Sequence, residues 1–194
     1  MNQKKLAGRD LINIGVYTAI YFVIVMAVAM FGFIPIFIPL LTVVVPLVGG
    51  IPYMLFVSKI KKFGMLTIMG TIIGLLMFVT GMGYWIILLG IVSGLLADLV
   101  LKSGNYESSK RSVLSSAVFS IWVFGNMMPF FLNRESYFAM LLDGYGNEYV
   151  ETLKGYMPMR IWPVLLIACV LFGFLGGLLG KKICRKHFER AGIV

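Results

Sequence analysis

The chain begins with an unusually long stretch that carries no charged side chain. Residues 11–58, 48 residues in all, contain no Asp, Glu, Lys or Arg, and the basic cluster Lys59, Lys61 and Lys62 follows at once. One helical crossing of a bilayer core needs about 20 apolar residues. The stretch is therefore too long for one crossing and long enough for two, which predicts an integral membrane protein.

Turn-forming and charged residues divide the rest of the chain into similar apolar segments. Gly32, Pro35 and Pro39 mark a turn within the first stretch, and a second uncharged run, residues 63–97, turns at residues 80–83. We therefore expect an all-α membrane bundle in a single domain over residues 1–194, with six spans at about 11–32, 37–58, 63–79, 84–101, 112–133 and 161–180.

The distribution of Lys and Arg predicts the orientation of this bundle. Six spans place both termini on one side, where the terminal segments and loops hold fourteen Lys and Arg; the other side holds only Arg134, Lys154 and Arg160. Cytoplasmic loops carry an excess of Lys and Arg, so we expect both termini in the cytoplasm and the chain in the plasma membrane. The net charge of +9 then reflects topology and contact with the anionic lipid bilayer, and not nucleic-acid binding.

The one long loop, residues 134–160, lies on the outer side in this topology. Its pattern predicts two short helices around residues 144–146, with Asn147 as the N-cap of the second. Its four tyrosines form either an interfacial aromatic belt or part of a lid over an outward-facing pocket. They are Tyr137, Tyr145, Tyr149 and Tyr156.

Residues that could carry catalysis are almost lacking. The only histidine, His187, lies in the basic C-terminal tail, and the sequence contains neither an HExxH nor a Walker A motif. Cys169 and Cys184 are too far apart for a CxxC pair, and we expect no metal, disulfide or cofactor. Asp98 precedes Lys102 by four residues, which suggests an interfacial ion pair or a partner contact, with a proton-coupling role as the alternative. We expect no enzyme, and no ATP hydrolysis by this chain alone.

Polar and aromatic residues gather near the outer ends of the spans. Pockets for small molecules have mostly apolar and aromatic walls with a few convergent polar groups. Arg134 and Arg160 could meet an anionic group or extend to lipid headgroups, and a buried Asn126 amide needs a partner that a ligand could supply. The candidate substrate-binding residues are Tyr84, Trp85, Trp122, Asn126, Asn133, Arg134, Tyr145, Arg160 and Trp162.

The first span also carries small residues at helical spacing. Gly15 and Ala19 form a small-xxx-small step, and Ala27 follows two turns later. Small residues let helix backbones approach closely in a membrane. They serve either packing within this bundle or docking of another membrane subunit.

Taken together, these features resemble the S component, the substrate-binding membrane subunit, of energy-coupling factor (ECF) transporters. The resemblance rests first on the layout, with six spans in 194 residues and both termini on the inside. It rests also on three local features: the amphipathic N-terminal segment 4–10, the small-residue face of the first span, and the sequence GLLADL at residues 94–99 near the end of the fourth span. Over its whole length, the general character of the sequence is similar to that of the Trep_Strep subgroup of S components, also called MptD-type.

The resemblance implies high-affinity binding of a vitamin-like micronutrient at the outer face. Uptake would then need a membrane T component and two cytoplasmic ATPase subunits as partners. Segments 31–38, 80–84 and 134–160 would close the pocket, and Gly15, Ala19 and Ala27 would dock the T component. The identity of the substrate stays open: it could be a flavin, a pterin, a thiamine-like molecule, a tetrapyrrole or another molecule. The alternative is a polytopic membrane scaffold or assembly factor without a small-molecule ligand.

Overall fold

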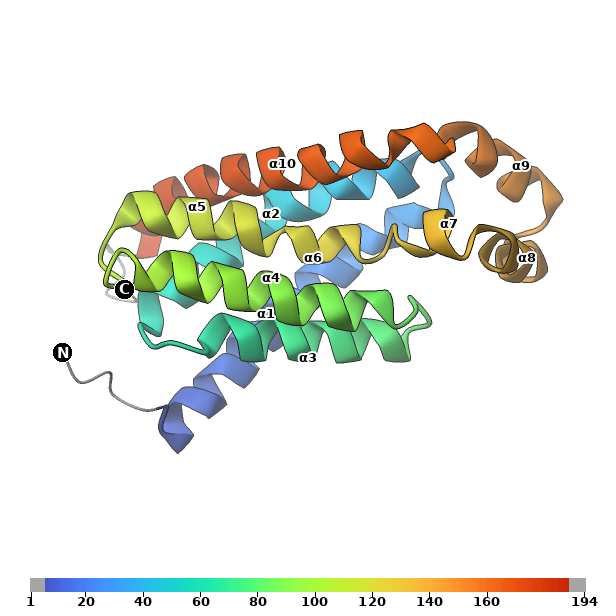
Figure 1. Cartoon of the computed structure of the whole chain (residues 1–194). Helices are drawn as coiled ribbons and strands as arrows, with labels where there is room; N and C mark the ends of the chain where they lie inside the picture. The colour runs from blue at the N-terminus through green and yellow to red at the C-terminus, as the bar shows by residue number, and fades with distance from the viewer. Residues whose placement is uncertain (1–5, 189–194) are drawn as a thin grey trace.

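The computed structural model of the chain describes residues 6–188, and all regular secondary structure in that part is helical (Figure 1). The predicted all-α fold class is thereby confirmed. The α-helices are α1 Gly8–Ala29, α2 Phe37–Lys59, α3 Met65–Val79, α4 Trp85–Lys102, α5 Ser109–Phe119, α6 Ile121–Phe124, α7 Pro129–Leu132, α8 Arg134–Tyr145, α9 Asn147–Tyr156 and α10 Trp162–Ile183. Two 3₁₀ turns, η1 Met30–Phe33 and η2 Met159–Ile161, and a π-helical turn, η3 Cys184–Phe188, complete them.

Four of the described helical segments are long and apolar enough to cross a membrane. They are Gly8–Phe33, Phe37–Lys59, Trp85–Lys102 and Met159–Lys186. The apolar helix α3 is shorter, with 15 residues. At 1.5 Å per residue it reaches about 22 Å, against about 30 Å for the hydrocarbon core.

The segment expected as a fifth span, residues 112–133, is not one continuous helix. The backbone N–H groups of Gly125, Asn126 and Met127 bond carbonyls three residues earlier, at 2.9–3.1 Å, as in a 3₁₀ helix. Pro129 explains the change because it has no N–H to donate and its ring excludes the carbonyl four residues before it. The chain still runs on through the bundle from α5 to α7 (Figure 1), but it is interrupted halfway.

Glycines hold α2 and α10 in backbone contact along the bundle (Figure 1). A Cβ atom added at Gly50 would lie 2.1 Å from the carbonyl carbon of Gly176, and one added at Gly176 would lie 2.3 Å from the carbonyl oxygen of Pro46. Small residues permit this approach in membrane proteins, where dispersion contacts drive helix association.

Helix α1 crosses the bundle obliquely and buries one narrow stripe against it (Figure 1). The stripe consists of Ile14, Thr18, Tyr21 and Val25, which are spaced at three or four residues. The indole Nε1 of Trp122 donates a hydrogen bond of 3.1 Å to the Tyr21 hydroxyl, which ties α1 to α6. Tyr17, Phe22, Met26 and Val28 are partly buried beside this stripe, and most other side chains of α1 face outward.

Asp98 on α4 is fully buried and caps the N-terminus of α3. Its carboxylate accepts hydrogen bonds from the backbone N–H of Leu66 and Thr67, at 3.2 and 2.9 Å, and from the Thr67 hydroxyl at 2.7 Å. The first turn of a helix leaves such N–H groups without partners. The expected ion pair with Lys102 is absent among the described residues; the Lys102 ammonium lies instead 5.1 Å from the centre of the Phe63 ring.

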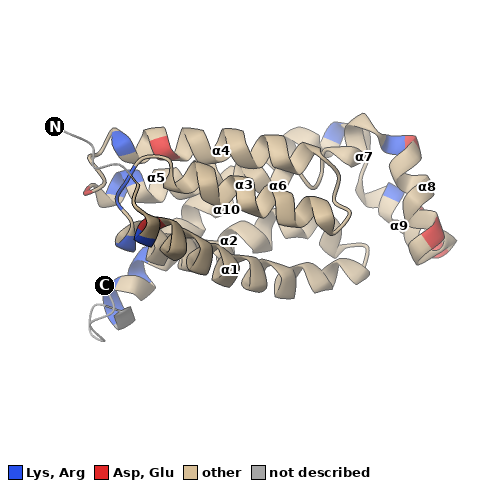
Figure 2. Ribbon diagram, turned by 90° about the horizontal axis from the view of Figure 1, so that it is seen from below, with Lys and Arg blue, Asp and Glu red and all other residues tan. Residues whose placement is uncertain are grey.

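The two ends of the bundle differ in charge (Figure 2). Basic side chains gather at the end where α1 begins and α10 finishes, which we call the basic end. Helices α8 and α9 lie at the opposite end (Figure 2), which we call the lid end, and they carry four of the eight acidic residues of the chain. These two helices match the pair predicted in the long loop. Asn147, however, is the first residue of α9 and not its N-cap, because Gly146 caps the helix with a φ of 82°.

Replacing Gly50 by alanine should destabilise the protein, because the new methyl group meets backbone that cannot move independently of α10. We expect a loss of about 1–3 kcal/mol, typical of overpacking. The matched control is Gly144→Ala in α8, where an added Cβ meets nothing within 4 Å. Thermal unfolding in detergent, followed by circular dichroism, compares the two variants, and equal melting temperatures would contradict close backbone packing of α2 on α10.

Candidate functional site

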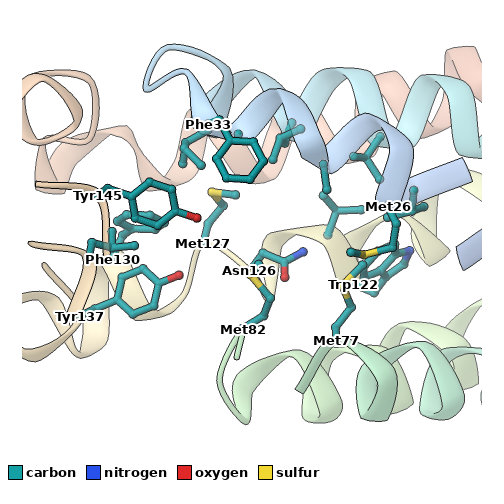
Figure 3. A pocket seen from close by; sticks show the side chains of 18 of the residues that line it. Met26, Phe33, Met77, Met82, Trp122, Asn126, Met127, Phe130, Tyr137 and Tyr145 are labelled. Atoms are coloured by element: carbon teal, nitrogen blue, oxygen red, sulfur yellow. The ribbon is translucent and has the colours of Figure 1, made fainter. Parts of the chain in front are cut away.

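A cavity of about 140 Å³ lies at the lid end of the bundle, beneath α8 and α9. Side chains of α1, η1, α2, α3, α6, α7, α8 and α9 line it, together with the segments that follow α3 and α6 (Figure 3). Every helix of the bundle except α4, α5 and α10 therefore contributes to its wall. An enclosed space shared by so many elements is the usual setting of a small-molecule site.

Most of the wall is apolar and adaptable. Four methionines, Met26, Met77, Met82 and Met127, come from four different parts of the chain and surround the space (Figure 3). Methionine is unbranched and polarisable, so it fits its contacts to ligands of different outline.

The Asn126 amide is the one side-chain amide in the described wall, and it lies near the middle of the cavity (Figure 3). Its Oδ1 atom is buried and has no hydrogen-bond partner. The 3₁₀ segment between α6 and α7 positions it there, because the chain no longer follows the path of a regular α-helix. A buried acceptor without a partner loses its hydration free energy, and a ligand that donates to it would restore a hydrogen bond.

Trp122 forms the wall at the end of the cavity that points into the bundle (Figure 3). The side chain is fully buried and its N–H is already used by the Tyr21 hydroxyl. The two rings meet edge to face, with centroids 6.1 Å apart. The indole is thus held in place and offers the cavity an apolar ring surface.

Tyrosines of α8 and α9 close the opposite end. The Tyr149 hydroxyl donates a hydrogen bond of 2.6 Å to the carbonyl oxygen of Gly32, and the Tyr145 ring stacks on Tyr149 at 4.6 Å and lies 6.2 Å from Phe33. Burial raises the pKa of Tyr149 to about 12, so its hydroxyl stays protonated as a donor at neutral pH. Tyr145 and Tyr149 thus connect the α8–α9 pair to η1 across the cavity mouth, and Tyr137 of α8 lines the same end of the cavity.

Three of the nine predicted substrate-binding residues, Trp122, Asn126 and Tyr145, line this cavity. Tyr84, Trp85 and Asn133 line a separate, shallower hollow at the N-terminus of α4. There the Trp85 Nε1 donates to Asn133 Oδ1 at 3.0 Å, and the Tyr84 and Trp85 rings lie 4.8 Å apart.

The remaining three, Arg134, Arg160 and Trp162, also lie outside the cavity wall. The Arg134 guanidinium donates to the carbonyl oxygens of Met157, at 2.7 Å, and Phe130, at 3.3 Å, and so joins α8 to the segment after α9. Arg160 and Trp162 are exposed at the start of α10.

Sequence reasoning missed most of the wall. Phe33, Phe130 and the four methionines carry no polar signal, and in a uniformly apolar chain nothing marks which apolar residues face a cavity. Tyr137 and Tyr149 could have been selected, because the long loop already suggested a lid.

The residues predicted to dock a partner lie on the outward face of α1. Gly15, Ala19 and Ala27 are exposed, and a Cβ added at Gly15 would meet nothing within 4 Å. Packing within this bundle, the alternative for this small-residue step, is therefore not their role in the structure.

Comparison with known proteins gives one family. Residues 8–190 match the family model described as a hypothetical bacterial integral membrane protein (Trep_Strep). Comparisons with curated proteins and with solved structures give no match.

Removing the Tyr149 hydroxyl should loosen the contact between α9 and η1. In Tyr149→Phe we expect backbone amides of residues 147–156 to exchange hydrogen about 2- to 10-fold faster, the effect of one lost hydrogen bond. Tyr156→Phe, an exposed tyrosine of the same helix, is the control. Hydrogen exchange read by mass spectrometry tests this, and equal rates in both variants would show that the hydrogen bond does not hold the lid.

Proposed function

The chain belongs to the Trep_Strep family of bacterial integral membrane proteins, and we propose that it is an S component of an ECF transporter, of the MptD-type subgroup. In this role it binds a vitamin-like micronutrient with high affinity and passes it across the plasma membrane. The observation that carries the proposal is the cavity beneath α8 and α9, at the end of the bundle opposite the basic end.

The charge distribution supports an outward-facing cavity. Of the fourteen Lys and Arg among residues 6–188, eleven lie toward the basic end and three, Arg134, Lys154 and Arg160, toward the other (Figure 2). The positive-inside rule assigns the basic end, and with it both termini, to the cytoplasm. The cavity then opens toward the outside, where a scavenged nutrient arrives.

Six crossings fit this orientation, although only four helices have the full length. A short apolar helix such as α3 can be accommodated by local thinning of the bilayer. Non-helical backbone at membrane depth is tolerated where it lines a cavity, and discontinuous helices build the sites of many transporters. The interrupted segment from α5 to α7, which carries Asn126 into the cavity, matches that pattern.

The size of the cavity implies that the lid moves. An engineered cavity of about 150 Å³ holds a molecule as small as benzene. A vitamin is larger than this, so the α8–α9 pair must shift outward to admit it and then close over it. The closing contacts are few, one hydrogen bond and a set of tyrosine and phenylalanine rings, which suits a segment that opens in function.

Energy for transport must come from other subunits, because the sequence has no Walker A motif. We infer that the partners are a membrane T component and two cytoplasmic ATPase subunits. The outward face of α1 with Gly15, Ala19 and Ala27 is the docking surface, since its small side chains leave room for a second helix.

A bulky residue on this face should prevent assembly without disturbing the chain itself. We expect Gly15→Leu to lose its partner subunits on affinity purification from native membranes, and to keep the melting temperature of the parent because the added side chain points into open space. Val164→Leu, on the exposed face of α10, is the control and should retain the partners.

The partners are identified by mass spectrometry of the purified complex. We predict that the T and ATPase subunits co-purify with the parent chain and with the control, but not with Gly15→Leu. Recovery of an unrelated membrane protein in their place would contradict the proposal and favour a scaffold without a small-molecule ligand.

A further inference from the structure

Charge is the first property that restricts what the cavity can hold. None of the described residues that line it is ionisable at neutral pH: they are aliphatic or aromatic residues, methionines, glycine, alanine and Asn126. A carboxylate or an ammonium group that enters such a space leaves water and finds no opposite charge, which is strongly unfavourable.

The nearest cations of the lid are engaged elsewhere. Arg134 donates to two backbone carbonyls and lies over the Phe138 ring at 4.8 Å. Lys154 pairs with Glu151 at 2.8 Å on the outer surface. Neither lines the cavity, so neither compensates an anion bound there.

The described cavity wall contains one buried acceptor without a partner, Asn126 Oδ1, and the Tyr137 and Tyr145 hydroxyls also face the space (Figure 3). The Trp122 indole, which also lines the space, already donates to a tyrosine hydroxyl of α1. Among the described residues, the buried Tyr106 hydroxyl also has no partner, but Tyr106 does not line the cavity. Asn126 Oδ1 lies in the middle of the space. A ligand that carries an N–H or O–H group gains a hydrogen bond there which a ligand without a donor cannot make.

The shape of the space favours a flat ring. Trp122 forms the wall at the inner end of the cavity, and the rings of Phe130, Tyr137 and Tyr145 line the end beneath α8 and α9 (Figure 3). Aromatic rings bind one another in offset or edge-to-face geometry. At about 140 Å³ the closed cavity has room for one six-membered ring with a small substituent.

We propose that this pocket selects an uncharged, flat ring, or the ring portion of a larger substrate, that donates a hydrogen bond to Asn126. It rejects rings that carry a carboxylate or a cationic group. The inference rests on the proposed function, since it takes this cavity as the substrate site, and it narrows the substrate to neutral heteroaromatic or aromatic amides, amines and alcohols.

Four probes of nearly equal shape separate the alternatives. Benzamide is neutral and has a donor, acetophenone is neutral without one, benzoate is an anion and benzamidine a cation. The chain has three tryptophans, and the Trp85→Phe/Trp162→Phe variant leaves only Trp122 to report on the cavity. Its fluorescence is titrated with each probe, with the full chain in lipid nanodiscs.

We expect benzamide to bind about 2- to 10-fold more tightly than acetophenone, the effect of one hydrogen bond, and more than about tenfold more tightly than either charged probe. Adding Asn126→Leu should abolish the difference between benzamide and acetophenone. Asn13→Leu makes the same substitution at an exposed asparagine of α1 outside the cavity wall, so it is the matched control and should retain the difference.

The proposal is overturned if benzoate or benzamidine binds as tightly as benzamide, if benzamide and acetophenone bind equally to the parent, or if no probe changes the Trp122 emission. The four probes are compared in the Trp85→Phe/Trp162→Phe chain with Asn126 intact, so poor folding of Asn126→Leu cannot hide the result. If partner subunits co-purify with the chain but the probes bind without this preference, the proposed function stands and the proposed substrate class is wrong. If the probes bind with this preference but no partner subunits co-purify, the substrate class stands and the proposed function is wrong.

Discussion

The need to satisfy backbone hydrogen bonds away from water is the constraint on which this structure depends. In lipid, a chain can leave the regular helix only where protein or a cavity surrounds it. Here the chain does so between α6 and α7, where Gly125 packs so closely on α4 that an added Cβ would lie 2.8 Å from the Cα of Ile86. Pro129, which has no N–H to donate, then keeps the chain from returning to the α-helical pattern before α7 begins. The break is protected by α4 on one side and opens to the cavity on the other.

The cavity, its polar group and its lid follow from that break. Because the 3₁₀ segment shifts the path of the chain, Asn126 enters the space between α1, α2 and α3. Helix α7 and the α8–α9 pair then continue over the same space, and Tyr149 fastens them to η1. Glycine contacts between α2 and α10 form the firm side of the bundle, whereas the lid is held by few contacts. The cavity therefore lies between a closely packed side of the bundle and one that is held by few contacts.

Much of the architecture could be predicted from charge alone. The long uncharged runs predict the apolar helices, and Gly144 and Gly146 in the long loop indicate where α8 ends and α9 begins. The interruption before Pro129 was not predicted, because the hydropathy of residues 112–133 is uninterrupted. Pro129 is the sequence signal that could have indicated it, and the close packing of Gly125 on α4 became visible only in the structure.

Which side chains face the cavity was harder to predict. Trp122, Asn126 and Tyr145 stood out as polar or aromatic residues, whereas the methionines had no distinguishing signal in a chain that is apolar on all faces. The role of Asp98 depends on the packing of α3 against α4, and that of Arg134 on carbonyls freed by irregular turns. Neither contact can be deduced from local spacing.

The most direct test of the account is native mass spectrometry of the chain purified in mild detergent from its natural host, compared with a variant whose cavity is filled. Ala29→Phe places a ring in the cavity wall on α1. The account predicts a parent chain that carries one small molecule of a single mass, and a variant that carries none. The same small molecule on both chains, or a bare chain in both, would contradict a binding site beneath α8 and α9.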